Sequence, residues 1–144
     1  MVAYAAAGTM SEKVRMQINQ ALSRAADRFN AGAYKDALDE FEVPYHLAPR
    51  GERPLYLGLI RVSAGLYHFE RGQPVSALKL YRSGRDLLAR VAPAVSDLQL
   101  QALVGELDAV YAPLLAAAGD EAKALRPSAR PQLQRVDRDG SDHV

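Results

Sequence analysis

The chain has 144 residues, of which 49% are hydrophobic and 24% charged, and this composition is typical of one globular domain with a sizeable core. Lysine and arginine total 18 against 17 acidic residues, so the net charge of +1 gives no electrostatic reason to expect nucleic acid or an anionic membrane as partner. The absence of cysteine excludes disulfides, thiolate metal sites and thiol nucleophiles, and it fits a cytoplasmic location.

Residues 1–10 are small and apolar but carry no basic start, so we expect a disordered N-terminal extension rather than a signal peptide. No run approaches about eighteen apolar residues, so no transmembrane helix is expected. A first helix is predicted after Ser11, a good N-cap residue. Apolar residues recur at every third or fourth position along one stripe, at Val14, Ile18, Leu22, Ala25 and Phe29.

The second helix is predicted from about Tyr34 to Glu42. Pro44 lacks a backbone N–H and restricts the residue before it, so we expect the helix to end or kink there. Residues 45–54 contain two further prolines and a glycine, a pattern typical of a loop.

A third helix is predicted to open after Pro54, because proline suits the first helical turn. It is apolar on nearly every side, as a central helix is. Gly58 and Gly65 each cost about 1 kcal/mol of helix propensity relative to alanine, which suggests that another helix approaches closely there.

The fourth helix is predicted from Pro74 to about Val91, and the fifth from Ser96-Asp97 onwards, with a kink expected at Pro113. The fifth helix is expected to cover the open end of the preceding helices. Residues 119–144 are polar, rich in both charges and interrupted by prolines, so we expect a flexible C-terminal tail. Such a tail is either simply solvated or a contact for a partner.

Residues 29–38 are partly repeated at residues 69–78, an offset of roughly forty residues that falls within the range of helical repeats. Both copies read F-x-x-G-x-x-x-x-A-L, in which Gly32 and Gly72 would allow a left-handed turn between two helices. The predicted fold is all-α: a compact bundle of about five helices over residues 11–118, built from two helix-turn-helix pairs and a capping helix.

The sequence contains no phosphate loop, zinc-binding helix motif or nucleophile elbow, so no catalytic residue, metal or cofactor is predicted. One candidate polar cluster consists of Asp39 and Glu42 on the second helix and Arg61 and His68 on the third. If these helices pack antiparallel, the four side chains form either a small site, with a base, a proton carrier and an anion-binding arginine, or a structural ion-pair network.

The repeated unit resembles half of a tetratricopeptide repeat, with Gly32, Tyr34, Ala37, Phe41 and Pro49 at the positions of that pattern. A closer resemblance is to a bacterial and archaeal family, domain of unknown function 309 (DUF309). The residues that carry it are Phe29, Asn30, Gly32, Tyr34, Ala37, Glu42, Gly58-Leu59-Ile60, Tyr67-His68, Gly72, Ala77, Leu80, Gly84 and Leu87. Leu38 stands where the family has histidine, and Asp39 where it has glutamate. The resemblance implies a compact helical domain and no agreed activity.

The leading functional hypothesis is therefore a non-enzymatic, cytoplasmic module that binds a protein or peptide, with a homodimer as one form of such binding. The alternative is a small enzyme or a metal- or anion-binding protein that uses the polar cluster. Nucleic-acid binding is the least favoured, because only a one-sided basic face would support it at this net charge.

Overall fold

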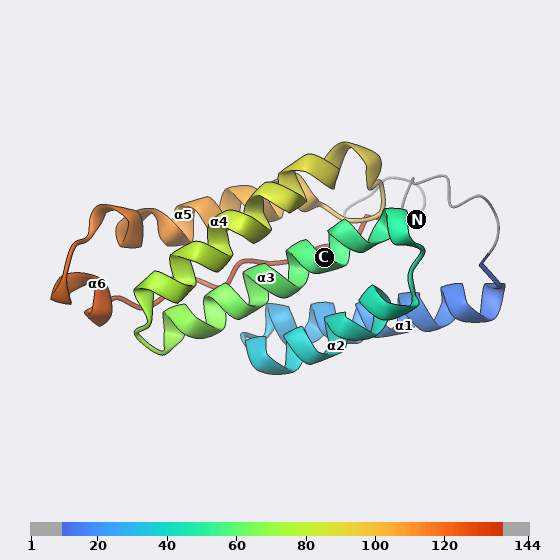
Figure 1. The fold of residues 1–144 in the computed structure, drawn as a ribbon, viewed down its shortest axis with the longest axis horizontal. Helices are drawn as coiled ribbons and strands as arrows, with labels where there is room; N and C mark the ends of the chain where they lie inside the picture. Colours follow the sequence, from blue (N-terminus) through green and yellow to red (C-terminus); the bar gives the residue numbers. More distant parts are fainter. Residues whose placement is uncertain (1–9, 137–144) are drawn as a thin grey trace.

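The computed structural model describes residues 10–136, and residues 1–9 and 137–144 lie outside the described part of the chain. Residues 10–136 form five long helices and one short helix, and they contain no strand (Figure 1). The elements are α1 (Glu12–Asn30), α2 (Tyr34–Leu47), η1 (Arg50–Glu52), α3 (Arg53–Glu70), α4 (Pro74–Val91), η2 (Ala92–Ala94), α5 (Leu100–Ala116) and α6 (Asp120–Ala124). One turn of 3-10 helix lies between α2 and α3, and another between α4 and α5. The predicted all-α fold is confirmed.

Two glycine turns organise the bundle. Gly32 ends α1 and Gly72 ends α3, with φ angles of +82° and +69°, in the left-handed region that glycine adopts without a Cβ penalty. In the first turn the N–H of Gly32 donates to the Phe29 carbonyl at 3.0 Å and that of Ala33 to the Arg28 carbonyl at 2.9 Å. The second turn repeats both hydrogen bonds. Both turns are therefore Schellman motifs, as the repeated sequence predicted.

The helices pack in chain order, α1 with α2, α2 with α3, α3 with α4, and α4 with α5, so that α3 is central (Figure 1). Glycines let α3 and α4 approach each other closely. A Cβ atom at Gly84 would lie 2.9 Å from the carbonyl oxygen of Gly58, and one at Gly58 would lie 3.3 Å from that of Gly84. This close approach agrees with the prediction made from the glycines of the third helix.

One continuous apolar core runs through the bundle, and ion pairs link elements that surround it. The carboxylate of Glu52 is only 1% exposed, and it accepts two hydrogen bonds from the Arg15 guanidinium, at 2.9 and 2.8 Å. On the other side of the bundle, Arg85 on α4 donates to Asp108 on α5 at 3.0 and 2.8 Å, and these hydrogen bonds lower the pKa of the Asp108 carboxyl. A buried carboxylate such as that of Glu52 requires its cation.

The predicted bounds of two helices need correction. Helix α2 does not end at Pro44 but continues to Leu47, with Pro44 buried inside it and its carbonyl accepting from the Ala48 N–H at 2.9 Å. The loop expected over residues 45–54 shrinks accordingly. Helix α5 begins at Leu100 rather than near residue 96: residues 95–99 are not helical, and Leu98 forms an antiparallel bridge with Arg135.

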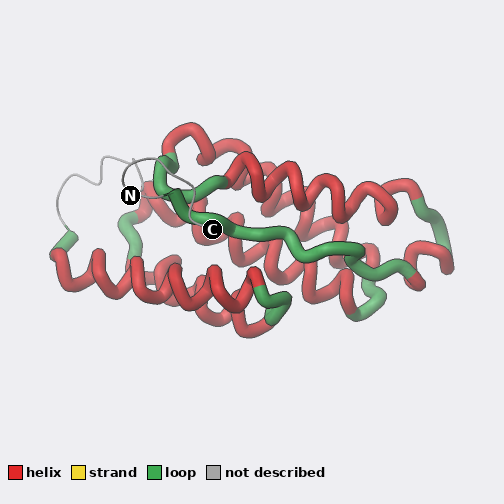
Figure 2. The backbone as a smooth tube through the Cα atoms, turned by 180° about the vertical axis from the view of Figure 1, so that it is seen from behind, coloured by secondary structure: helices red, strands yellow, loops and turns green. Residues whose placement is uncertain are grey.

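The C-terminal part differs most from its prediction. Residues 119–136 do not form a loose tail: α6 is followed by residues 125–136, here called the strap, which run back along the bundle (Figure 2). The strap crosses the face between the α1–α2 pair and α5, and its Leu133 is 2% exposed and belongs to the core. Buried side chains and backbone hydrogen bonds give this segment its order.

Candidate functional site

The candidate site is the groove in which the strap lies. The strap passes the α3–α4 turn, then the α1–α2 turn, and ends beside residues 95–99 (Figure 2). Among residues 10–136, most of the strap belongs to no helix or sheet, so the groove must supply the hydrogen bonds and packing that fix its position.

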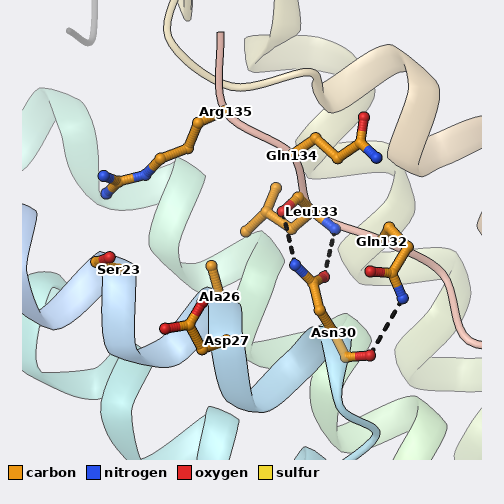
Figure 3. A pocket seen from close by; sticks show the side chains of 8 residues that line it. All are labelled: Ser23, Ala26, Asp27, Asn30, Gln132, Leu133, Gln134 and Arg135. Atoms are coloured by element: carbon orange, nitrogen blue, oxygen red, sulfur yellow. Dashed lines mark hydrogen bonds between the residues drawn. The ribbon is translucent and has the colours of Figure 1, made fainter. Parts of the chain in front are cut away.

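The side chain of Asn30, the last residue of α1, forms hydrogen bonds with the backbone of the strap (Figure 3). Its side-chain Nδ2 donates to the Leu133 carbonyl at 3.0 Å, and its Oδ1 accepts from the Leu133 N–H at 2.7 Å. The side chain of Gln132 adds a hydrogen bond from Nε2 to the Asn30 carbonyl at 3.1 Å. One amide thus satisfies both backbone groups of Leu133, a residue 103 positions away.

The opposite edge of the strap pairs with residues 97–99, which precede α5. The Gln99 N–H donates to the Gln134 carbonyl at 2.9 Å, and the Val136 N–H donates to the Asp97 carbonyl at 3.0 Å. Leu98 and Arg135 form an antiparallel bridge between these hydrogen bonds. The strap is therefore held by main-chain contacts on both sides, as a peptide is when it adds to the edge of a sheet.

Side chains of the strap fill alternate positions in the groove. Pro131 and Leu133 are buried, whereas Gln132 and Gln134 between them are partly exposed. Arg135 reaches α1, where Nη2 donates to the Asn19 carbonyl at 3.2 Å. This alternation is the one expected for an extended chain with one face on an apolar surface.

The two glycine turns each receive an arginine of the strap. A Cβ atom at Gly32 would lie 2.8 Å from Arg130 Nε, and a Cβ atom at Gly72 would lie 2.9 Å from Arg126 Nη2. Burial raises the pKa of the nearby Glu70 carboxyl, and the positive charge of Arg130 partly offsets this rise. The arginine side chains thus occupy space that a Cβ atom at Gly32 or Gly72 would restrict.

A cavity of about 370 Å³ remains between α1 and the strap (Figure 3). Its lining comes from α1 and from the strap alone: Ser23, Ala26, Asp27, Asn30, Gln132, Leu133, Gln134 and Arg135. Because most of these groups are polar, the cavity suits water or polar side chains better than an apolar ligand. The strap therefore fills the groove only in part on the α1 side.

The residues of the predicted polar cluster have other partners. Asp39 pairs with Lys35 within α2 at 2.9 Å, and both side chains are more than half exposed. Glu42 is exposed on the same helix. Neither carboxylate forms an ion pair with Arg61 among the described residues.

On α3, Arg61 turns towards α4 and donates to Ser83 Oγ at 2.6 Å, while the His68 ring hydrogen-bonds to Gln73 just beyond the helix. The structure therefore brings none of the four side chains into hydrogen-bond contact with another. Within residues 10–136, no group of three histidine or acidic side chains is placed to hold a metal ion.

The contact between Asn30 and the strap was not predicted from the sequence, from which residues 119–144 were expected to form a flexible tail, either solvated or in contact with a partner. A signal was present: Arg126-Pro127 and Arg130-Pro131 form two equal dipeptides in a segment that otherwise lacks pattern. The arginine of each dipeptide lies over one of the two glycine turns.

Residues 22–80 match the model of a protein family described as "Domain of unknown function (DUF309)". The match includes Asn30 and both glycine turns but not the strap. Comparisons with curated proteins and with solved structures found no match. Within residues 10–136, no helix is both long and apolar enough to span a bilayer.

Proposed function

We propose that this chain, which belongs to the DUF309 family, is a non-enzymatic module that binds extended peptide segments of other proteins. The family description assigns no activity. The groove between α1 and residues 95–99 would be the binding site, and the strap would be the occupant that the chain itself provides. A cytoplasmic location, which the lack of cysteine fits, is part of the proposal.

The observation that supports the proposal best is the pair of hydrogen bonds from the Asn30 amide to Leu133. These hydrogen bonds involve the backbone N–H and C=O of Leu133 and not its side chain. Any extended segment whose side chain fits the position of Leu133 can therefore form them. The pairing of Gln99 and Asp97 with the other edge of the strap has the same property. Main-chain contacts combined with pockets for alternate side chains are a general mode of peptide recognition.

The connection of the strap to the bundle also supports exchange. Residues 117–119 join α5 to α6, and Gly119 there has a φ of +59° and no neighbour within 4 Å of the position of a Cβ atom. Helix α6 has no buried residue. A partner peptide competes with a tethered strap whose effective concentration is on the order of millimolar. Binding is therefore expected to be strong only when the strap is released.

The test uses the full chain with Leu133→Glu, which places a carboxylate in the buried leucine position and releases the strap without altering the groove. A fluorescein-labelled peptide of residues 125–136 is titrated with this variant and with the wild-type chain, and fluorescence anisotropy is recorded. Leu115→Glu serves as the matched control, because Leu115 on α5 is 45% exposed.

The Leu133→Glu chain is expected to bind the peptide, whereas the wild-type and Leu115→Glu chains bind it at least tenfold more weakly. Adding Asn30→Ala to the released chain is expected to abolish most of the binding. If the released chain is helical by circular dichroism and binds no peptide, the proposal is wrong. If the wild-type chain forms dimers that Leu133→Glu abolishes, the occupant of the groove is the strap of a second copy.

A further inference from the structure

The strap places one arginine over the glycine of each helix-turn-helix pair, and the Arg126 guanidinium is also held within its own segment, where Nη1 donates to the Lys123 and Leu125 carbonyls at 2.8 Å each. Arg126 lies over Gly72 in the α3–α4 turn, and Arg130 lies over Gly32 in the α1–α2 turn. Each arginine is followed by proline, so the strap reads Arg-Pro-Ser-Ala-Arg-Pro-Gln-Leu over residues 126–133. Two arginines four residues apart in the strap thus contact two glycines forty residues apart in the bundle.

The turns favour arginine for physical reasons. Each turn follows the C-terminal end of a helix, α1 or α3, where the helix dipole leaves partial negative charge. Glu70 in the last turn of α3 adds a full negative charge that acts on Arg130. The positive φ of each glycine and its missing Cβ leave room for a planar guanidinium at the backbone.

The prolines and the spacing favour an extended occupant. Proline fixes φ near −65° and biases the residue before it towards extended conformations. Four residues of extended chain reach about 13 Å, and in the extended strap this length places Arg126 and Arg130 over separate glycine turns. One additional residue between the two arginines would therefore move the second guanidinium away from its glycine turn.

We infer that the partner of this groove is a protein segment of the form Arg-Pro-x-x-Arg-Pro-x-Leu, with one arginine packed over each glycine turn and the leucine side chain buried in the core where Leu133 lies. This inference rests on the proposed function and adds to it the chemical class of the ligand. The strap then acts as an internal copy of the partner segment and keeps the groove closed until a competing segment is present.

The test uses the full Leu133→Glu chain and a set of labelled peptides based on residues 125–136. Arg126→Ala and Arg130→Ala remove one guanidinium each, and a third peptide has one alanine inserted between Ser128 and Ala129. Ser128→Ala is the matched control, because this side chain is exposed and has no hydrogen bond to any residue that the structure describes. Each peptide is titrated at low and at high salt.

Loss of either arginine is expected to weaken binding about fivefold at low salt and less at high salt, because salt screens the attraction of exposed charges. The inserted peptide should lose at least as much, and the Ser128→Ala peptide should bind as tightly as the original. In a double-mutant cycle, Glu70→Gln in the chain should weaken the original peptide about threefold but leave the Arg130→Ala peptide unchanged.

If all peptides bind within twofold of the original, the ligand class is wrong while the groove still binds peptides. If no peptide binds to the folded, released chain, the ligand class and the proposed function both fail. If the Glu70→Gln chain weakens all peptides equally, Arg130 is not read at the α1–α2 turn, and the assignment of one arginine to each turn is overturned.

Discussion

The Asn30→Ala substitution tests how the strap is held. It removes the two hydrogen bonds to Leu133, of 3.0 and 2.7 Å, and leaves an N–H and a C=O without their partner. Each such hydrogen bond contributes about 1 kcal/mol, so the strap should open more easily by about 2 kcal/mol. This corresponds to a roughly thirtyfold larger open population, since 1.4 kcal/mol is tenfold.

Native-state hydrogen exchange by NMR measures this opening directly. Three amide protons report on it: that of Leu133, and those of Gln99 and Val136, which form the paired edge. Their exchange should accelerate roughly thirtyfold in Asn30→Ala, because local opening exposes them. The amide of Leu59 in the buried centre of α3 should keep its wild-type rate.

The matched control is Asn19→Ala, which removes an exposed asparagine side chain from the same helix but keeps the backbone carbonyl that Arg135 uses. It should leave all four exchange rates unchanged. Two outcomes would contradict the reasoning. Unchanged exchange at Leu133 would show that the amide clamp does not hold the strap. Equal acceleration at Leu59 would show that the strap opens only when the whole bundle unfolds.

Three further predictions concern the bundle, and each is checked by urea unfolding. Arg15→Leu leaves the buried carboxylate of Glu52 without its cation and should destabilise the fold by about 3–5 kcal/mol. Gly84→Ala places a Cβ atom 2.8 Å from a methyl group of α3 and should cost about 1–3 kcal/mol, whereas Gly105→Ala, with open space around it, should stabilise by about 1 kcal/mol. The pKa of the Asp108 carboxyl is lowered, so its contribution is present above the unfolded pKa of about 3.9 and is lost as pH falls through the folded pKa; the stability difference from Asp108→Asn should therefore shrink in acid.

The helices were predictable because their signals are local. Ser11 accepts a hydrogen bond from the Val14 N–H at 3.2 Å as the N-cap of α1, and Pro74 opens α4, both as expected from sequence. Pro44 was misjudged because a proline removes only one helical hydrogen bond. Tertiary packing of the buried proline outweighs that loss, and the helix continues for another turn.

The predicted polar cluster does not form because residues that share one face of α3 do not all face α2, the helix assumed to lie opposite them. Arg61 and His68 are two turns apart on α3, but Arg61 lies against α4, where its Cβ is 2.9 Å from the position of a Cβ at Gly84. Its polar partner is therefore Ser83 and not an acid of α2. Sequence spacing gives the periodicity of one helix, whereas the direction in which a face points depends on the packing of all helices.

The position of the strap could not be predicted from the sequence, because the segment lacks a regular pattern of apolar residues. Only Pro131 and Leu133 are buried in it at alternate positions, and two apolar residues do not distinguish a strand from a loop. Its position is fixed by backbone groups that every sequence has, joined to Asn30 and to residues 97–99. Main-chain contacts of this kind place few demands on side chains, so the sequence of the strap alone gives little sign of where it lies.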